Sequence, residues 1–333
     1  MEKVVIALDA MGGDYAPEQT VKGAVEAVNS SDEIRVILVG KQDMIAKELE
    51  KYEYAKEDIE VVHASEIIDM GDVPTVAIKD KKDSSLVVAM RLVREGKADA
   101  LVSAGNTGAV LVGGQLVVGR LKGIKRPPLA PFIPTTKGFS LLIDCGANVD
   151  ARPEHLVQFA QMGSIYYENV MGKKNPTVAL LNIGTEEEKG NQLVKDTKPL
   201  MKECKNINYI GSVEARELVS GAADVIVCEA FVGNVVLKFF EGLALTLFGS
   251  LKEGLMSSTR TKLGALLVKP ALKGLKNQFD TSSQGGAPLL GLKGLVVKAH
   301  GNSSSKEIEI ALKQCISFKK QKINEKIKES ICD

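Results

Sequence analysis

Residues 4–14 of the chain read VVIALDAMGGD, an apolar run that ends in an acidic, glycine-rich turn. Similar short runs rich in Val, Ile and Leu recur at residues 4–8, 36–39, 59–62, 100–102, 141–143, 178–181, 225–227 and 295–297. Most of these runs are continuous rather than alternating, which is typical of strands that are buried on both faces of a parallel sheet. Helical patterns separate them, so the sequence predicts an α/β fold with a mostly parallel, doubly wound sheet.

The composition is that of an ordinary globular protein. The 333 residues are 44% hydrophobic and 26% charged, and 43 basic side chains face 42 acidic ones, which leaves a formal net charge of +1. A chain with so little net charge, no Trp and 5% aromatic residues is a poor candidate for binding nucleic acid. The length fits one catalytic domain over residues 1–333 or two lobes, with the proline-rich segment 126–134 as a candidate crossing.

The five cysteines are widely spaced and form no CxxC pattern. This argues against a disulfide framework or a zinc ribbon, and a reducing, cytoplasmic location is expected. The N-terminus has no basic leader, and no uncharged apolar stretch approaches the ~20 residues that a membrane span needs.

Polar and glycine residues follow six of the apolar runs directly. They form turns at residues 9–14, 103–108, 144–148, 182–191, 228–234 and 298–301. Each turn alone also fits a purely structural role, because Gly and Asn are common turn residues. Ligands of parallel sheets bind beyond the carboxyl ends of the strands, so six such turns at one sheet edge favour a site for a polar ligand.

The turn at 103–108 leads directly into an apolar helical pattern, and Gly233 and Asn234 precede another. Helix N-termini present amide N–H groups and a partial positive charge, which makes them suitable sites for an anion. Three side chains at these turns can add a hydroxyl, a cation or a hydrogen bond: Thr107, Lys189 and His300. Such donors suit phosphate better than an apolar ligand.

Several other catalytic motifs are absent from the sequence. It contains no GxxxxGK[ST], GxGxxG, HExxH or GxSxG pattern and no zinc-spaced Cys/His cluster. We therefore expect no P-loop, no standard dinucleotide site, no metal, no cofactor and no serine nucleophile. No candidate base accompanies the cysteines in the sequence, so they are expected to be inert core thiols.

Seven motifs appear along the chain in a fixed order: Asp9-Ala-Met-Gly-Gly-Asp14, Ser103-Ala-Gly-Asn-Thr-Gly108, Asp144-Cys-Gly-Ala-Asn148, Pro153-Glu-His-Leu-Val157, Asn182-Ile-Gly-Thr-Glu186, Gly233-Asn-Val235 and Lys298-Ala-His-Gly301. With this ordered set, the chain resembles the PlsX family of bacterial phosphate acyltransferases from Val4 to about Ala311. Cys145 is the one departure, because the family pattern has Val there.

The resemblance implies a three-layer α/β/α sandwich like that of phosphotransacetylases and isocitrate dehydrogenases. It implies transfer of a long-chain acyl group from acyl carrier protein to inorganic phosphate, without a cofactor. The acyl phosphate product would feed a membrane glycerol-3-phosphate acyltransferase in phospholipid synthesis. The resemblance also implies a homodimer in the cytoplasm that associates peripherally with the membrane.

In that reaction phosphate attacks a thioester carbonyl, so the protein needs no nucleophile of its own but must hold phosphate and the oxyanion. The catalytic candidates are His300, Asn234 and Lys189, with His300 orienting phosphate or protonating the leaving thiolate. The substrate- and phosphate-binding candidates are Asp9, Gly12, Gly13, Ser103, Asn106, Thr107, Asp144, Asn148, Asn182, Gly184, Thr185 and Gly233. For the aspartates, fixing the loops through neighbouring amides is an equal alternative.

Residues 254–279 carry five basic side chains and no carboxylate. Leucines and a methionine of this segment fall within an arc of about 120° at 100° per residue, and Pro270 is expected to divide it into a basic, amphipathic helical hairpin. The docking candidates are Arg260, Lys262, Leu263, Leu266, Leu267 and Lys269. An anionic membrane, an acidic carrier protein and a second subunit all remain possible partners.

Three other functions stay open at this stage. A phosphotransacetylase-type enzyme would use acyl-CoA as the donor, and a metal- and NAD-dependent dehydrogenase would share the related fold. A noncatalytic scaffold would use the polar turns only as turns.

Overall fold

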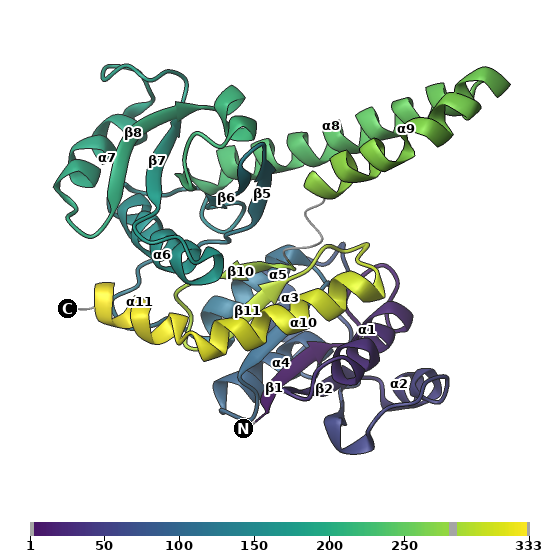
Figure 1. Cartoon of the computed structure of the whole chain (residues 1–333). Helices are drawn as coiled ribbons and strands as arrows, with labels where there is room; N and C mark the ends of the chain where they lie inside the picture. Colours follow the sequence, from purple (N-terminus) through teal and green to yellow (C-terminus); the bar gives the residue numbers. More distant parts are fainter. Residues whose placement is uncertain (1–2, 280–284, 332–333) are drawn as a thin grey trace. The chain divides into compact units, whose positions relative to one another are not determined.

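The computed structural model describes residues 3–279 and 285–331, apart from the side chains of Lys276 and Asn277 (Figure 1). The chain divides into two compact units, each with its own sheet. The first unit contains Met1–Pro131, Gln161–Asn175 and Ser282–Asp333, and the second contains Phe132–Ala160 and Pro176–Thr281. The first passage between them falls within the proline-rich segment 126–134.

The first unit holds a six-stranded sheet in the order β10-β11-β4-β1-β2-β3. Its strands are β1 (Val4–Asp9), β2 (Ile34–Gly40), β3 (Ile59–His63), β4 (Ala100–Ser103), β10 (Ala287–Leu289) and β11 (Leu295–Lys298). All neighbours are parallel except β10 and β11. Strands β4 and β11 are buried at every residue, which explains their continuous apolar sequence.

The helices of this unit are α1 (Glu18–Asn29), α2 (Gln42–Leu49), α3 (Pro74–Asp80), α4 (Ser85–Arg94), α5 (Thr107–Gly113), α10 (Ser305–Lys320) and α11 (Ile323–Ile331). A short 3-10 turn, Lys56–Asp58, precedes β3, and a π-helical turn, Gly114–Val118, continues α5. Helices α1 and α10 pack closely against each other (Figure 1). Gly23 permits this approach, because a Cβ atom there would lie 2.7 Å from the Cβ atom of Ile308.

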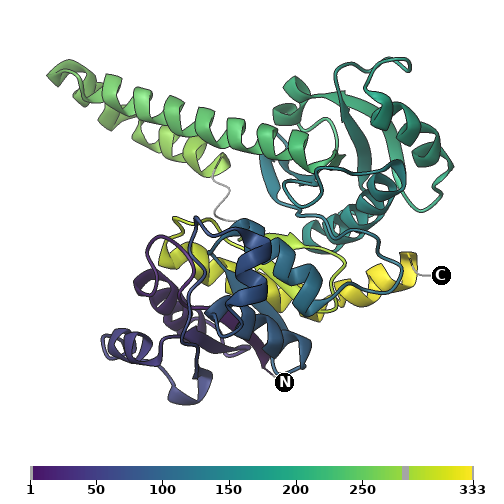
Figure 2. The ribbon, with the colours of Figure 1, turned by 180° about the vertical axis from the view of Figure 1, so that it is seen from behind.

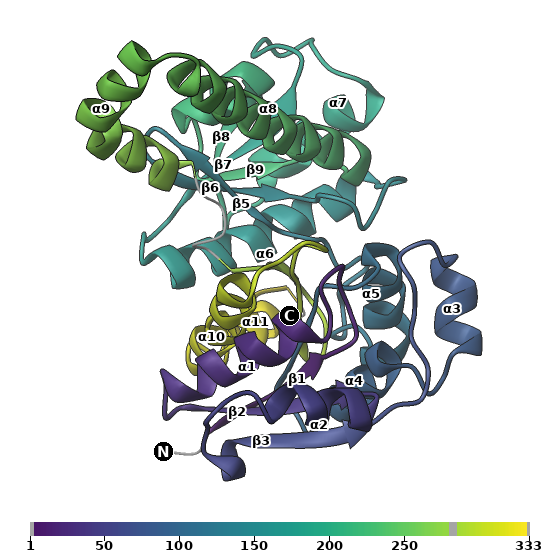
Figure 3. The same cartoon turned by 90° about the vertical axis from the view of Figure 1, so that its right-hand side faces the viewer.

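The second unit holds a five-stranded sheet in the order β5-β6-β9-β7-β8. Its strands are β5 (Phe132–Thr135), β6 (Gly138–Ile143), β7 (Thr177–Asn182), β8 (Asn208–Glu214) and β9 (Val225–Val227). Strands β5 and β6 are antiparallel, whereas β6, β9, β7 and β8 run parallel (Figure 3). Helix α7 (Gln192–Glu203) and the 3-10 helix Ala215–Ser220 belong to this unit, and α6 (Pro153–Met171) begins here and ends in the first unit.

The mostly parallel α/β fold is thus as predicted, but the strands form two sheets instead of one. The expectation that six turns share one sheet edge is therefore wrong. The burial pattern of a strand shows that it is covered on both faces, but it does not show which other strand it pairs with. The sequence also gave no signal for β8, because this strand is only partly buried and lacks a continuous apolar run.

Helices α8 (Ala230–Met256) and α9 (Thr259–Gln278) form a long helical hairpin in the second unit (Figure 2). The predicted division at Pro270 is wrong, because Pro270 lies inside α9. The chain turns instead at Ser257 and Ser258. There the Ser258 hydroxyl accepts a hydrogen bond from the Thr261 amide at 3.2 Å and thereby caps α9.

A buried carboxylate ties α10 to the end of α1. Glu309 accepts hydrogen bonds from Lys306 Nζ at 2.6 Å, Lys313 Nζ at 2.7 Å and Ser30 Oγ at 2.9 Å. Burial disfavours the ionised form, but the bonds from Lys306, Lys313 and Ser30 outweigh it and lower the pKa of Glu309 to about 2.

We predict that this carboxylate contributes to the acid sensitivity of the fold. Folding lowers the pKa of Glu309 from its ordinary value of 4.5 to about 2. Its contribution to stability is therefore fully present at pH values above 4.5 and is lost as the pH falls toward about 2. Glu309→Gln should therefore flatten the dependence of the free energy of unfolding on pH in this range, as measured by urea titration. The control is Glu329→Gln, because Glu329 is exposed. Glu307 on α10 is unsuitable as a control position, since its carboxylate belongs to the capping box of that helix. Equal pH slopes for wild type and Glu309→Gln would contradict the assignment.

Candidate functional site

Three of the predicted turns lie together at the carboxyl edge of the first unit's sheet. Strands β11, β4 and β1 are adjacent and parallel, so their carboxyl ends meet at one edge. The turns that follow them are 9–14, 103–108 and 298–301. Direct contacts join these turns, because the Asp14 amide donates to the Gly301 carbonyl at 2.7 Å and the Ala299 amide to the Ser103 carbonyl at 2.9 Å. We call this group of turns the first-unit cluster.

Asp9 lies at the base of this cluster. Its side chain is buried, and its Oδ2 atom accepts a hydrogen bond from the Ser103 hydroxyl at 2.7 Å. The Ser103 hydroxyl in turn accepts one from the Gly105 amide at 3.1 Å. Burial raises the pKa of the Asp9 carboxyl above its ordinary value, against hydrogen bonds from Ser85 and Ser103 that lower it. Asp9 and Ser103 therefore fix the turns from below, in line with the loop-fixing alternative for the aspartates.

Gly12 and Gly13 are needed because the turns approach one another closely. A Cβ atom on Gly12 would lie 2.4 Å from Asp9 Oδ2 and 2.8 Å from the Gly105 amide nitrogen. Gly13 has a φ of +111°, which side chains rarely adopt, and a Cβ atom there would lie 3.0 Å from the Gly301 carbonyl oxygen. Both glycines thus serve the packing of the cluster.

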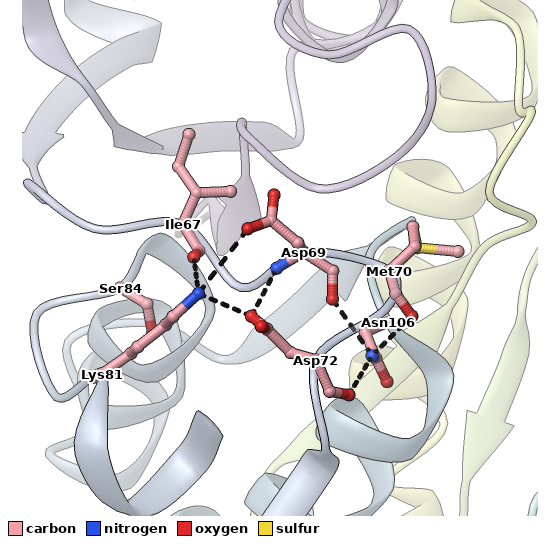
Figure 4. A network of polar contacts seen from close by, with 7 residues as sticks. All are labelled: Ile67, Asp69, Met70, Asp72, Lys81, Ser84 and Asn106. Atoms are coloured by element: carbon pink, nitrogen blue, oxygen red, sulfur yellow. Dashed lines mark hydrogen bonds and ion pairs between the residues drawn. The ribbon is translucent and has the colours of Figure 1, made fainter. Parts of the chain in front are cut away.

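Asn106 was predicted to bind phosphate, but the protein itself occupies its side chain. The Oδ1 atom accepts from the Ala109 amide at 3.0 Å and caps α5. The Nδ2 atom donates to the carbonyls of Asp69, Met70 and Asp72 at 3.1, 3.0 and 3.1 Å (Figure 4). In this arrangement Asn106 joins the cluster to residues 67–72, which we call the 67–72 loop.

The N-terminus of α5 remains the best anion-binding feature of the first-unit cluster. Thr107 is exposed, and the amides of Thr107 and Gly108 have no acceptor among the residues that the structure describes. His300 is exposed on the neighbouring turn, after β11. These groups suit a small anion held by backbone amides beside an imidazole.

The role of Lys298 in this cluster was not predicted from the sequence. This lysine ends β11 and is buried, and its ammonium group donates to the carbonyls of Ala104 and Ala299. Its charge also acts on the buried Asp9 carboxyl. A lysine at the end of an otherwise apolar strand was the available signal.

The other three turns lie on the second unit. Strands β6, β9 and β7 are adjacent and parallel, and the turns 144–148, 228–234 and 182–191 follow them. Asp144 is completely buried, and its carboxylate accepts from Asn148 Nδ2 at 2.7 Å and from the Ala147 amide at 3.1 Å. Asp144 and Asn148 therefore shape the turn after β6. We call these three turns the second-unit cluster.

The prediction that Gly233 and Asn234 precede a helix and form an anion site at its N-terminus is wrong. Helix α8 begins at Ala230, so both residues lie inside the helix and do not precede it. The Glu229 carboxylate already accepts from the Phe231 and Val232 amides at 2.6 and 2.8 Å, which caps the helix with a negative charge.

The 182–191 turn is held by a second buried lysine that sequence analysis missed. Lys198 Nζ donates to the carbonyls of Glu186, Glu187 and Lys189 at 3.0, 2.7 and 3.0 Å. Asn182 Nδ2 donates to the Gly184 and Lys189 carbonyls at 2.9 and 3.1 Å, so Asn182 is a structural residue of this turn. Two candidates on the turn have exposed side chains: Thr185 and Lys189.

The site candidates thus fall into two groups. The first-unit cluster holds Asp9, Gly12, Gly13, Ser103, Asn106, Thr107 and His300, and the second-unit cluster holds Asp144, Asn148, Asn182, Gly184, Thr185, Lys189, Gly233 and Asn234. Burial raises the pKa of the Cys145 and Cys228 thiols well above its ordinary value, which makes them poor nucleophiles. Among the described residues, no three His, Cys, Asp or Glu side chains are grouped to hold a metal ion.

The docking candidates all lie on α9. Arg260, Lys262 and Lys269 are exposed, and so are the three leucines, with Leu267 85% exposed. Helix α8 beside them is long and apolar enough to cross a membrane by its length and composition, and only 6% of that stretch is buried. Such a helix was not predicted from the sequence, because Lys238 and Glu241 interrupt the apolar run near the middle of the helix and Lys252 and Glu253 interrupt it near the end.

The fold defined by these sheets is that of the phosphotransacetylases. A phosphotransacetylase from Streptococcus pyogenes superposes with a TM-score of 0.64 at 17% identity, covering 94% of this chain and 93% of its own. The EutD phosphotransacetylase from Staphylococcus aureus superposes with a TM-score of 0.60 at 18% identity, covering 96% and 94%. At such identities the likeness concerns the fold alone, and it confirms the predicted fold class.

The sequence places the chain more narrowly. A family described as "Fatty acid synthesis protein" matches residues 4–326. A phosphate acyltransferase from Alkaliphilus oremlandii is 55% identical over 326 residues, covering 98% of this chain and 97% of its own. A phosphate acyltransferase from Clostridium acetobutylicum is 50% identical over 324 residues, covering 97% and 98%. The chain belongs to this family of phosphate acyltransferases, and the predicted PlsX relationship is confirmed.

We predict that Asn106 is required mainly for local structure. Asn106→Ala removes the α5 cap and leaves three carbonyls without their donor, so the free energy of unfolding should fall by about 2–4 kcal/mol. Asn106→Asp keeps the capping oxygen but directs a carboxylate at the three carbonyls, so it should be no more stable than Asn106→Ala. Urea titration measures both, with the exposed Asn302→Ala as control. A stable Asn106→Ala protein that had lost only phosphate affinity would favour the original ligand assignment.

Proposed function

We propose that the protein transfers a long-chain acyl group from acyl carrier protein to inorganic phosphate. The products are an acyl phosphate and the free carrier thiol. Membership of the phosphate acyltransferase family supports phosphate as the acceptor. The observation that carries the proposal is the first-unit cluster, where the Thr107 and Gly108 amides lie at a helix N-terminus on a turn next to His300.

The proposed reaction needs no covalent enzyme intermediate. A phosphate oxygen attacks the thioester carbonyl carbon, the tetrahedral intermediate collapses, the C–S bond breaks and the thiolate takes up a proton. The α5 amides hold the phosphate, because backbone donors and the helix dipole favour a dianion without further reorganisation. His300 orients the phosphate or supplies the proton to the thiolate.

The exposed side chains of the second-unit cluster remain further candidates for contact with the substrate. Lys189 and Thr185 sit on a turn that Lys198 and Asn182 hold in one conformation. Asn234 is exposed near the start of α8.

We further propose that the α8–α9 hairpin attaches the enzyme peripherally to an anionic membrane from the cytoplasm. A long-chain acyl phosphate is amphiphilic, and the proposed consumer, a glycerol-3-phosphate acyltransferase, is a membrane enzyme. The exposed leucines and cations of α9 suit both acyl chains and acidic headgroups. An acidic carrier protein fits the same charges, and a homodimer that covers the apolar part of the hairpin is compatible with the same proposal.

The deciding experiment measures the release of carrier thiol from palmitoyl acyl carrier protein with and without phosphate. We expect release that requires phosphate, and an acyl phosphate that hydroxylamine traps as a hydroxamate. Palmitoyl-CoA should be the poorer donor. Equal or better turnover of the CoA ester would support the phosphotransacetylase alternative, and release that is independent of phosphate would contradict both.

The same assay tests His300. His300→Ala should lower kcat by about 100-fold, the lower end of what a positioned acid contributes. His63→Ala is the matched control, because His63 is also exposed and ends β3 of the same sheet. Near wild-type turnover of His300→Ala would remove His300 from the mechanism.

We predict that a charge on the apolar part of α9 abolishes membrane attachment. Leu266 is 67% exposed, so Leu266→Glu should fold normally but no longer float with phosphatidylglycerol vesicles, because a carboxylate is repelled by the anionic surface. Val219→Glu, at another exposed apolar position of the same unit, should float like wild type. Unchanged flotation of Leu266→Glu would contradict the membrane proposal, and a raised KM for the acyl carrier would support carrier docking.

A further inference from the structure

The 67–72 loop connects β3 to α3 and borders the first-unit cluster. Asn106 holds it from the side of the cluster, and Lys81 holds it from the other side (Figure 4). We propose that this loop presents Met70 as the contact for the acyl chain and so sets the chain-length preference of the enzyme. The inference rests on the proposed function and names a substrate-contacting residue that the resemblance did not include.

Lys81 fixes the conformation of the loop. Its ammonium group donates to the Ile67 carbonyl at 2.8 Å and to Asp72 Oδ2 at 2.6 Å, and it lies 3.6 Å from Asp69 Oδ2. Asp72 Oδ2 also accepts from the Asp69 amide at 2.8 Å. The hydrogen bond from Lys81 lowers the pKa of the Asp72 carboxyl, so the pair is ionised at neutral pH. The loop is thus held at both ends by one partly buried lysine.

The three bonds from Asn106 to the loop carbonyls add a second attachment. Because Asn106 also caps α5, the loop and the amides of Thr107 and Gly108 share one support. A loop that is already ordered loses little conformational entropy when a substrate binds to it, so its side chains can contribute affinity. This makes the loop suitable for reading part of the substrate.

Met70 stands out because it is exposed although its backbone is fixed. Its side chain is 53% exposed, and Figure 4 shows it on the Asn106 side of the loop, away from Lys81. The Cε atom lies 3.2 Å from the position of a Cβ atom on Gly301, a position that is 3.4 Å from Asp14 Oδ2. The methionine therefore reaches the turns of the first-unit cluster. Val73, three residues further along the chain, is a second exposed apolar residue, at 62%.

The apolar character of Met70 and Val73 indicates which part of the substrate they would contact. Phosphate and a peptide-like prosthetic arm are polar and gain nothing from an exposed methionine and valine. The acyl chain is apolar, and each buried methylene contributes about 0.8 kcal/mol, or about fourfold in affinity. Methionine is flexible and polarisable, so it can follow chains of different lengths.

The test compares saturated acyl carrier donors from eight to eighteen carbons. Met70→Ser should lower the ratio of kcat/KM for long over short chains by about three- to tenfold, because methylene contacts are lost only for chains that reach residue 70. Met44→Ser is the matched control, since Met44 is a similarly exposed methionine on α2 of the same unit. A uniform decrease for all chain lengths, or no change, would overturn the proposal.

The support of the loop is tested separately. Lys81→Met should lower the same ratio, and Lys81→Arg should restore it, because arginine can keep the ion pair with Asp72. Lys82→Met alters the exposed neighbour and should have no effect. A change in melting temperature without a change in the chain-length ratio would mean that Lys81 has only a structural role.

Binding measurements separate this inference from the proposed function. A thioether analogue of the acyl carrier cannot react, so its affinity can be measured by calorimetry without phosphate. If wild type shows no phosphate-dependent turnover, the proposed function fails, whereas the affinity ratio of long to short analogues still reports on Met70. A ratio that is equal in wild type and Met70→Ser would overturn the inference in either case.

Discussion

Burial of the central parallel strands on both faces is the constraint on which the rest of this structure depends. Strands β4, β11 and β9 have no exposed residue, so no chemistry can start from the strands themselves. The polar groups of the two clusters lie at the carboxyl ends of the strands and in the turns that follow, where the chain leaves the sheet. The two sheets apply this rule independently, which gives each unit its own cluster of three turns on three adjacent strands.

This constraint explains why strands were predicted well and their assembly was not. A continuous apolar run shows that a strand is covered on both faces, but pairing is a property of the whole chain. The start of α8 was misplaced because Gly233 and Asn234 resemble helix breakers. Residue 233 is a glycine because a Cβ atom there would collide with the Asp144 carbonyl oxygen, a close approach that no local sequence pattern reveals. Pro270 misled because proline usually ends or kinks a helix, whereas here it lies inside α9.

The site candidates were found by residue type, and residue type does not separate ligand contact from support. Asp9, Asp144 and Asn106 are buried and bonded within the chain, and the buried lysines Lys198 and Lys298 donate only to carbonyls in the bonds described. Hydrogen bonds to buried polar groups fix one conformation, because leaving such a group unpaired costs more than its bond contributes. Asp9 is satisfied only in part, since its Oδ1 atom is buried without a hydrogen-bond partner among the described residues. The groups left to meet an anion in the first-unit cluster are then the backbone amides at the start of α5 and the exposed side chains of Thr107 and His300. The motifs therefore predicted the polar turns, but they did not separate the side chains that support these turns from the exposed ones.

An enzyme that joins an acyl chain to phosphate must offer polar and apolar surfaces to one molecule. The first-unit cluster offers both kinds of surface, because one Asn106 side chain caps α5 and also donates a hydrogen bond to the Met70 carbonyl. The α8–α9 hairpin differs from the 67–72 loop, because its exposed leucines and phenylalanines are spread along two long helices. Apolar area of that extent is unfavourable in water unless something covers it. The partner that covers this apolar area must also accommodate the cations of α9. It either carries acidic groups that pair with them or leaves their charged ends in water. The proposed substrate recognition and the proposed membrane attachment thus rest on two separate apolar features: Met70 on a loop held by hydrogen bonds, and the exposed leucines and phenylalanines of the α8–α9 hairpin.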